Sequence, residues 1–593
     1  MLGKRDAQRG LFEADTQYIE AVGKGNFYGF LASVRGELFS DEQFAHLYTL
    51  DNGRPSVPPS LLATALLLQA HERLSDQEAK ERADFDLRWK VALGIGIDSH
   101  PFAKSTLQLF RAQLITNDKA KEVFVASLKL AKSKGYLAKN RKLRVALDTT
   151  KILGRGAVKD TYNLLADGIV LLLRRLASVA GSTLEPFAKE HGYDRYVAEK
   201  SLKGGAELDW DNAKERARLL AAIVADADRL LGQARTVRQT LPEGGAEAAA
   251  LTKAAEILSQ VLVQDITRSE VGPELRDGVA KDRMPSAHDP EMRHGHKSAQ
   301  NRFDGHKAQI AVDTEEGFIT SAAVLPGNAP DSELAKAMVE ETEVNTGLAV
   351  EETIGDCAYG RGATRQEFAE AGRSLVAKVA TTSNAGRFPK SDFAIDLAQQ
   401  TCVCPAGNLG TARYRRVRTP GEQPTLRAFQ FAAALCAECP LRAQCVRAKG
   451  GRSIAVHAQE ALLQQARALQ HSAAFGDYRC KRQVVEHRIA RLVQLGIRQA
   501  RYFGRKKTAF QLLMAAAVAN LTLLASKIQD AELANSQSRT VYALFALTFA
   551  TWALLYRPSA PPAAQTNPGQ PHALTPLTPL TTPRRYCPAQ PRF

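Results

Sequence analysis

Signals for secretion or membrane insertion are missing from the sequence. The first residues, MLGKRDAQRGLFEADTQ, are mixed in charge and contain no apolar stretch, so we expect no secretory signal. The longest apolar run, at residues 541–556, is shorter than the roughly 20 residues that span a bilayer. A packed or aggregation-prone terminal helix is favoured there. The sequence therefore predicts a cytoplasmic protein without a membrane partner.

Cysteine is also scarce. Only 8 cysteines occur in 593 residues, and five of them fall between Cys402 and Cys445. This distribution is unlike a disulfide framework spread over a secreted protein. The phosphate-binding pattern G-x-x-x-x-G-K-[ST] is absent as well, so nothing indicates the use of ATP.

The composition is that of an ordinary globular protein with an excess of positive charge. Hydrophobic residues make up 45% and charged residues 24%, and 593 residues are too many for one core, so two to four domains are expected. The 79 Lys and Arg exceed the 63 Asp and Glu by 16. Such an excess favours a polyanionic partner, either nucleic acid or an acidic membrane surface.

Helical patterns fill the N-terminal region, residues 1–125. The segment SVPPSLL suits a helix start, and Arg111 is expected on the exposed side of a later helix. This region is either a helix-turn-helix-like DNA-binding module or a plain helical bundle. At the other end, the tail at residues 531–593 begins hydrophobic and becomes rich in Pro, Thr and Ala, so we expect it to be partly disordered.

A mixed α/β region is predicted between these ends, at residues 140–530. Strand-like runs occur at residues 142–150, 305–317, 318–328, 351–360 and 374–380. The second and third runs meet at Glu315-Glu316-Gly317, which predicts a hairpin. Residues 164–263 have helical periodicity and predict an inserted helical hairpin, followed by a polar loop at residues 272–298. A cysteine-bearing insertion covers residues 385–455, and helices follow it.

Two of the predicted strands end in an aspartate. In KLRVALDTT the leucines and valine alternate on one face, and Asp148 lies on the other. Asp356 follows the strand in IGDCAYG, where Gly355 leaves space for a ligand or a neighbouring backbone. Either aspartate alone could cap a loop. Whether they form a functional site therefore depends on finding further acidic residues elsewhere in the chain.

A third acid stands in a strongly basic helix. Between Tyr478 and Phe510 ten residues are Lys or Arg, and Glu486 is the only acid. Arg482 precedes it by one helical turn, which by itself indicates an intrahelical salt bridge. Because the other basic residues would remain unpaired, we favour a carboxylate that faces a groove built for phosphates.

Asp148, Asp356 and Glu486 are therefore candidate metal ligands. Hard divalent cations bind carboxylate oxygens and keep positions open for water and phosphate. Two such ions, roughly 3.5–4 Å apart, stabilise the attacking and leaving oxygens of an in-line displacement. The three acids thus indicate a Mg²⁺ (or Mn²⁺) site for cutting and joining phosphodiesters.

Three motifs make the chain resemble the DDE transposases of bacterial insertion sequences. RVALDTTKI is similar to the first-aspartate strand of that family, and ETIGDCAYG to the second, with its Asp-x-x-Tyr signature at Asp356 and Tyr359. The stretch RQVVEHRIARLVQLGIRQARYFGRKKTAFQLLMAAAVANL resembles the helix of the third acid, with Arg482 four residues before Glu486, and the helix that follows. The resemblance covers residues 40–530. It implies an RNase H-like catalytic domain in which the three acids are catalytic.

The chain departs from one branch of that family around the third acid. Tyr478 lies eight residues before Glu486 instead of seven, and Val493 stands where a Lys or Arg is usual. Arg488, Arg491 or Lys506 is the expected substitute for that basic residue. The resemblance implies DNA contacts from Arg482, Arg488, Arg491, Lys297, Lys307, Lys506 and Lys507.

Two basic loops carry the same tripeptide. GHK occurs at residues 295–297 and 305–307, near Arg293 and Arg302. These loops are either solvated basic loops or phosphate-positioning elements at the mouth of the site, and the resemblance favours the second reading. A metal site formed by His288, His294 and His296 is a less favoured alternative.

The clustered cysteines form a zinc-type pattern. TCVCPAGN and LCAECPLRAQC contain five cysteines, one more than a tetrahedral site needs. Similar transposases carry the same C-P-x-G and C-x-x-C-P set, which implies Cys404, Cys436, Cys439 and Cys445 as ligands of a structural Zn²⁺. Reduced core thiols without a metal are the alternative.

The resemblance implies a transposase that cleaves the ends of an insertion sequence and transfers the cut strands. Its expected partners are double-stranded DNA, namely terminal inverted repeats and target DNA, and further copies of itself in a homodimer or higher oligomer. A metal-dependent structure-specific nuclease without strand transfer, and a non-catalytic DNA-binding derivative, remain alternatives. Strand-transfer assays distinguish the three.

Overall fold

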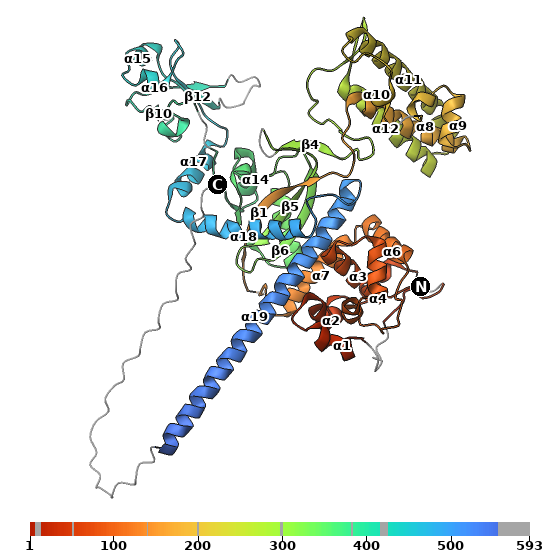
Figure 1. The fold of residues 1–593 in the computed structure, drawn as a ribbon. Coiled ribbons are helices and arrows are strands. Elements are labelled where there is room, and N and C mark those ends of the chain that lie inside the picture. The colour runs from red at the N-terminus through yellow and green to blue at the C-terminus, as the bar shows by residue number, and fades with distance from the viewer. Residues whose placement is uncertain are drawn as a thin grey trace. The chain divides into compact units, whose positions relative to one another are not determined.

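The computed structural model describes residues 1–5, 14–49, 53–138, 140–198, 201–296, 300–380, 384–415 and 425–555, with side chains described up to residue 534. The chain divides into two compact units, residues 1–521 and residues 522–593. The apolar run at residues 541–556 and the Pro-rich tail lie outside the described side chains. Figure 1 shows the course of the chain.

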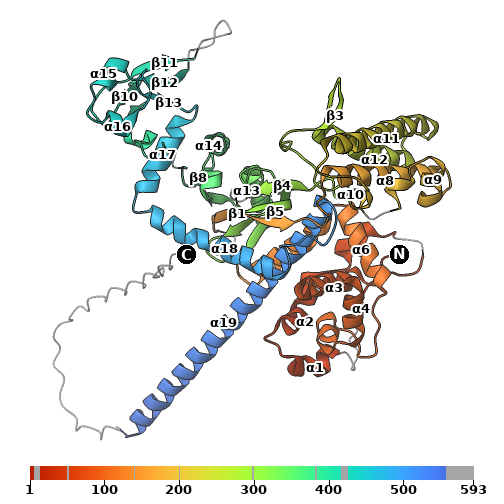
Figure 2. The same cartoon turned by 45° about the horizontal axis from the view of Figure 1, so that its top comes forward.

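Helices come first along the described chain, and strands enter after α7 (Figures 1 and 2). The α-helices are α1 (Ala14–Val22), α2 (Phe27–Leu38), α3 (Pro59–Glu72), α4 (Asp76–Phe85), α5 (Leu87–Leu93), α6 (Lys104–Thr116), α7 (Ala120–Ser133), α8 (Thr161–Val179), α9 (Leu184–Glu190), α10 (Leu202–Gly205), α11 (Ala213–Thr240), α12 (Ala246–Asp265), α13 (Ala335–Thr346), α14 (Gly362–Glu370), α15 (Ala433–Ala437), α16 (Arg442–Cys445), α17 (Glu460–His471), α18 (Phe475–Gln494) and α19 (Arg505–Leu555). The 3₁₀ helices are η1 (Glu42–Leu47), η2 (Asp194–Tyr196), η3 (Cys357–Tyr359) and η4 (Lys390–Asp392). The strands are β1 (Leu143–Leu153), β2 (Ile266–Ser269), β3 (Gly272–Leu275), β4 (Arg293–His296), β5 (Arg302–Asp313), β6 (Ile319–Pro326), β7 (Val350–Ile354), β8 (Ser374–Val376), β9 (Ala394–Asp396), β10 (Thr401–Val403), β11 (Thr411–Tyr414), β12 (Leu426–Gln430) and β13 (Ser453–Ala455).

The N-terminal helices begin where local sequence signals place them. Pro59 is the first residue of α3, where its missing N–H costs nothing. Helix α4 starts at a capping box, in which the Ser75 hydroxyl accepts from the Glu78 amide and the Glu78 carboxylate accepts from the Ser75 amide. The helical prediction for this region is therefore confirmed.

The expected exposure of Arg111 on α6 is wrong. Arg111 is only 7% exposed, and its guanidinium donates to both carboxylate oxygens of Asp76 at 2.7 and 2.6 Å. Burial opposes ionisation of Asp76, but hydrogen bonds from Arg111, Gln69 and Gln108 hold its pKa well below its usual range. The helical periodicity placed Arg111 on the side of α6 opposite its apolar residues, which predicted exposure. Asp76 of α4 packs against that side of α6 and buries the guanidinium. The pair joins α6 to the start of α4.

The central sheet has six strands in the order β4-β5-β1-β7-β8, and β6 also pairs with β5. Strand β5 is antiparallel to β1, β4 and β6, whereas β1, β7 and β8 are parallel to one another. The ladder between β5 and β6 confirms the predicted hairpin. Gly317 in its turn has a φ of +81°, a conformation that glycine adopts without strain.

The register of the sheet brings Asp148, which lies in the middle of β1, next to the end of β7. Ala146 of β1 pairs with Ile354 of β7, and this is the last pair of their parallel ladder. Asp148 and Asp356 each lie two residues beyond that pair. Since adjacent parallel strands run in the same direction, Asp148 and Asp356 lie at the same level along their two strands.

Helices cover the sheet and fix its position. Helix α13 packs against β5, β6 and β7, and α18 packs against β1 and β5. In α18, Val485 and Leu492 are fully buried, which places the neighbouring Glu486 at the border of the sheet. Asn520 of α19 accepts from the Ile319 amide at 2.8 Å and donates to the Ile319 carbonyl at 2.9 Å, which ties α19 to the first residue of β6.

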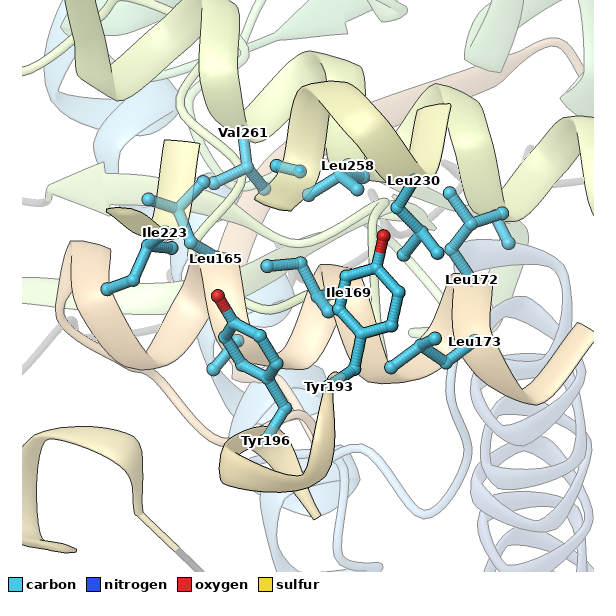
Figure 3. Close-up of a cluster of buried hydrophobic side chains, with 14 of the residues drawn as sticks. Leu165, Ile169, Leu172, Leu173, Tyr193, Tyr196, Ile223, Leu230, Leu258 and Val261 are labelled. Atoms are coloured by element: carbon cyan, nitrogen blue, oxygen red, sulfur yellow. The ribbon is translucent and has the colours of Figure 1, made fainter. Parts of the chain in front are cut away.

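The segment inserted between β1 and β4 has a hydrophobic core of its own. Helices α8, α11 and α12 pack together, and α9 and η2 add further buried residues (Figure 3). Tyr193 and Tyr196 point into this core beside Ile169 and Leu173. The prediction of helix here is confirmed, but the segment is a small bundle instead of a single hairpin.

Parts of the predicted polar loop at residues 272–298 form strands. Strand β3 pairs with β2, and β4 pairs with β5 at the edge of the central sheet. The sequence of β4, RHGH, has no apolar alternation, so backbone pairing alone explains it. An added Cβ on Gly295 would lie 2.4 Å from the Gly327 carbonyl oxygen, so only glycine fits there.

The helix Arg505–Ala534 is, within the described residues, long and apolar enough to cross a membrane. Of its most apolar window, 72% is buried inside the protein. Burial of this kind is typical of a core helix, so its composition follows from packing.

Candidate functional site

Three carboxylates from three different elements line one pocket. Asp148 comes from β1, Asp356 follows β7, and Glu486 comes from α18. The pocket has a volume of about 430 Å³. Its other lining residues are Thr149, Thr150, Lys151, His296, Asn301, Phe303, Lys307, Asp331, Arg482, Ile489 and Arg498. The structure thus brings together the three acids that the sequence singled out.

Asp148 lies deeper than Glu486. Its side chain is 19% exposed, compared with 46% for Glu486. Burial raises the pKa of Asp148 to about 6, and the Thr149 amide, which donates to it at 2.7 Å, opposes this rise. The charge of Asp356 raises the pKa further, Arg482 lowers it and Glu486 raises it. The repulsion among the three acids favours binding of a cation.

Arg482 supplies positive charge inside this group of acids. One of its guanidinium nitrogens lies 3.4 Å from a carboxylate oxygen of Asp148. The other donates to Glu486, one helical turn along α18. The intrahelical salt bridge predicted from the spacing is therefore present, and it extends to the sheet.

Asp356 is held by a short helix. Its carboxylate accepts from the Ala358 amide at 2.8 Å and caps η3. Gly355 is required beside it because an added Cβ would lie 2.7 Å from the Tyr359 side chain. The close neighbour of Gly355 is thus an aromatic side chain, where the sequence suggested a ligand or backbone.

Asp331 is a fourth carboxylate of the pocket, and sequence reasoning missed it. Lys307 donates to its side chain at 2.7 Å, and Gln309 donates to its carbonyl at 3.0 Å. Gln309 also donates to the Tyr359 hydroxyl at 3.1 Å. Burial, followed by the charges of Asp148 and Asp331, raises the pKa of Tyr359 well above its usual range. The signal for Asp331 was its place in a polar segment directly after a strand, as for Asp356.

Two further basic residues line the pocket from the other side. Arg498 donates to the Thr150 hydroxyl at 3.0 Å and to the Lys151 carbonyl at 3.3 Å. The Lys151 ammonium donates to Asn301 at 2.8 Å. These contacts place positive charge next to the acids, where a phosphate would need it.

The predicted DNA-contacting residues are dispersed. Arg482 and Lys307 line the three-acid pocket, whereas Lys297 lies outside the described residues. The other four are placed elsewhere: burial lowers the pKa of Arg488 and of Arg491, Lys506 pairs with Asp118 at 2.9 Å, and Lys507 is exposed.

Tyr478 and the histidines are engaged with separate acids. The Tyr478 hydroxyl donates to Glu352 at 2.9 Å. His294 lies 2.9 Å from Asp304, and His288 lies 3.8 Å from Asp167, whereas His296 lines the three-acid pocket. Over the described ranges no group of three or more His, Cys, Asp or Glu is arranged to hold a metal ion, and this covers the three acids and the clustered cysteines as well as the histidines.

Four cysteines line one small cavity of about 20 Å³. They are the four expected zinc ligands Cys404, Cys436, Cys439 and Cys445. Burial raises the pKa of Cys445, and the positive charge of Arg452 opposes this rise. The thiols of Cys436, Cys404 and Cys439 raise the pKa of Cys445 further, as expected for neighbouring thiols. Cys402 is fully buried in the core of this segment beside Phe429, where burial raises its pKa to about 11. Cys402 is therefore the cysteine left outside the group.

Two protein families match parts of the chain. Residues 403–525, which include Glu486 and the four grouped cysteines, match the family described as Transposase DDE domain. Residues 17–113, which cover most of the N-terminal helices, match the family described as Transposase domain (DUF772). No curated protein and no solved structure matches the chain.

Proposed function

Because this chain belongs to the DDE transposases of insertion sequences, we propose that it cleaves DNA at the ends of its element and joins the cut strands to target DNA. The observation that carries this proposal is the shared pocket of Asp148, Asp356 and Glu486. Carboxylates from β1, the end of β7 and α18 converge although they are far apart in sequence. Basic residues surround them, as a phosphodiester substrate requires.

The same proposal includes an RNase H-like fold for the catalytic region. Its support is the strand order, in which β6, β5 and β1 are antiparallel neighbours and β7 and β8 continue the sheet in parallel with β1. The helical segment after β1 and the cysteine-rich segment before α17 are insertions into this sheet domain. The N-terminal helices would then contact DNA.

The proposed cofactor is Mg²⁺ or Mn²⁺, held by Asp148, Asp356 and Glu486. The donor set fits, because all three side chains offer carboxylate oxygens to one pocket. Burial raises the pKa of Asp148, and the charges of Asp356 and Glu486 raise it further, so a bound cation would relieve the cost of ionising this acid. When bound, the divalent ion polarises the phosphodiester and makes an attacking hydroxyl more acidic. Arg482 must release Asp148 and Glu486 for those oxygens to become available.

The chain's own residues have two tasks in this mechanism. Arg482 and Arg498 would hold the phosphate oxygens, since both line the pocket and carry forked donors. Lys307 and Gln309 would position Asp331 and Tyr359 behind the acids. Water would first attack the phosphorus in line and break its bond to the 3′ oxygen of the element end, which leaves as a 3′-hydroxyl. This hydroxyl would then attack a phosphorus of the target DNA in line and displace the 3′ oxygen there, without a covalent protein intermediate.

A strand-transfer assay tests the function. Purified full-length protein is incubated with Mg²⁺, a duplex that carries an end of the element, and a target plasmid. Joined products support transposition, whereas nicks alone would indicate a nuclease and shifted but uncut DNA a binding protein. We expect Glu486→Gln to abolish cutting and joining while DNA binding persists.

The matched control is Asp477→Asn. Asp477 is the other acid of α18, is exposed, and does not line the pocket. Its substitution is expected to leave cutting unchanged. If the Glu486→Gln variant still joined DNA strands, Glu486 would not be a catalytic residue.

We also propose a structural zinc site at the four grouped cysteines. Thiolate sulfur suits Zn²⁺, and four ligands would close its coordination sphere, so the ion would stabilise the segment and take no part in catalysis. Elemental analysis should find one zinc per chain, and Cys439→Ser should remove it. The exposed Cys357, changed to serine, is the control. Wild-type protein free of zinc would contradict this site.

The remaining parts of the proposal concern partners and location. The substrates would be double-stranded DNA at terminal inverted repeats and at the target, bound by a homodimer or higher oligomer. The protein would act in the cytoplasm, on the nucleoid.

A further inference from the structure

A second pocket lies where the cysteine-rich segment meets α17. It has a volume of about 360 Å³ and shares no lining residue with the three-acid pocket. Its lining residues are Val379, Ala380, Asn384, Gly386, Arg387, Pro389, Lys390, Ser391, Arg467, Gln470 and His471. None of the functions described so far uses it.

The floor of this pocket is fixed by packing. Val379, which follows β8, forms a small buried cluster with Leu463 and Ala466 of α17. The Gln470 side chain accepts from the Val379 amide at 3.0 Å. Helix α17 is therefore docked on the end of the sheet, and the pocket is a built feature between two anchored segments.

The charge of the pocket is strongly positive. Arg387, Lys390 and Arg467 line it together with His471, and no acid is among its lining residues. Glu460, which does not line the pocket, has a side chain that is 2% exposed and pairs with both Lys390 and Arg467, at 2.5 and 3.1 Å. This buried carboxylate thus pairs with two of the three permanent cations of the pocket, and Arg387 is the third.

The concentration of positive charge also affects Arg365, which lies close to the pocket residue Arg467. Burial lowers the pKa of Arg365, and the positive charge of Arg467 lowers it further. Lys390 and Arg467 are held by Glu460, but Arg387 has no side-chain hydrogen bond or ion pair within the described part of the chain. An uncompensated guanidinium in a concave site is suited to an anion.

We propose that this pocket binds a backbone phosphate of DNA, with Arg387 as the main contact and Lys390 and Arg467 as supporting charges. This inference rests on the proposed function, because it assigns a second anchor for the DNA that the three-acid pocket cuts. Among the described residues that line the pocket there is no Phe, Tyr or Trp to provide the stacking surface that a nucleobase would need. The ligand is therefore the phosphate of the backbone, and the contact carries no sequence preference.

The test is the salt dependence of DNA binding by the full-length protein. Affinity for an end-bearing duplex and for a random duplex is measured from 50 to 200 mM KCl without divalent metal. One lost phosphate contact lowers the slope of log K against log salt by about 0.9. We expect this change for Arg387→Ala with both duplexes, whereas Arg387→Lys should keep most of the slope.

The control is Arg413→Ala, on the exposed strand β11 of the same segment. It should keep the wild-type slope, and matching circular dichroism spectra exclude misfolding. An unchanged slope for Arg387→Ala overturns the phosphate site, as does wild-type protein that binds neither duplex. If binding and the slope change are present but wild-type protein neither cuts nor joins with Mg²⁺, the proposed function fails and the phosphate site stands.

Discussion

Arg482 of α18 lies 3.4 Å from Asp148 of β1, although 334 positions separate them in the sequence. The same guanidinium donates to Glu486, so it links the first and third acids of the pocket. A guanidinium can neutralise carboxylates, but unlike a divalent cation it provides no coordination site for an attacking water. We therefore regard Arg482 as a built-in counter-ion that competes with a divalent cation for these oxygens.

Removing this counter-ion should strengthen metal binding. In Arg482→Gln the three acids repel one another more strongly, so the protein without metal should melt at a lower temperature. Mg²⁺ or Ca²⁺ should then raise the melting temperature by more than in the wild type, with roughly tenfold tighter apparent binding. Thermal melts with and without metal measure both effects. Arg479→Gln, an exposed change on the same helix, is the control, and equal metal responses in both variants would contradict the prediction.

The pKa of Asp148 predicts how stability changes with pH. Because folding raises this pKa from 3.8 to about 6, the folded state favours the protonated acid. The stability that the folded state gains from protonation of Asp148 is fully present below pH 4 and is lost as the pH rises through 6. Asp148→Asn should therefore be more stable than the wild type at pH 8, by up to about 3 kcal/mol. Denaturant titrations should show the difference vanish at pH 4; a difference independent of pH would refute it.

Arg111 should be essential for stability instead of DNA contact. Its removal would leave the partly buried Asp76 without its ion-pair partner, although Gln69 and Gln108 still donate to it, and costs about 1.5–3 kcal/mol. Arg111→Leu is expected to lower the midpoint of urea unfolding accordingly, whereas Lys104→Ala, on the exposed start of the same helix, should change it little. An Arg111 variant as stable as the wild type would contradict this role.

Asn520 should matter for the attachment of α19. Asn520→Ala removes both hydrogen bonds to the backbone of Ile319 and leaves that buried amide and carbonyl unsatisfied. The expected loss is about 2–4 kcal/mol. Hydrogen exchange at Ile319 should accelerate to a matching degree. The exposed Asn117, changed to alanine, should have no such effect.

The sequence predicted the sheet well where apolar residues alternate or where a turn is marked. Strands β1, β5, β6 and β7 were found in this way, and with them the two aspartates beyond the β1–β7 ladder. Strand β4 was missed because backbone pairing holds it and its sequence carries no alternation. Glu486 was found through charge, as the single acid in a basic helix.

Other features depended on partners that no local pattern reveals. The burial of Arg111 follows from Asp76, 35 positions earlier, and periodicity contains no information about that acid. Asp331 enters the pocket because Lys307 and Gln309, on β5, hold its loop there. The positive pocket around Arg387 arises only when α17 packs on Val379. Contacts between residues far apart in the sequence therefore explain both the wrong predictions and the residues that the sequence analysis missed.

The order of the three acids along the chain has a consequence for protein synthesis. The ribosome releases the N-terminal helices and β1 early, but α18 emerges only after residue 475. A nascent chain that has grown past Asp356 but not into α18 has two of the three acids and lacks Glu486. It also lacks the buried helix α19, so we expect neither the stable sheet domain nor cleavage activity before synthesis is nearly complete.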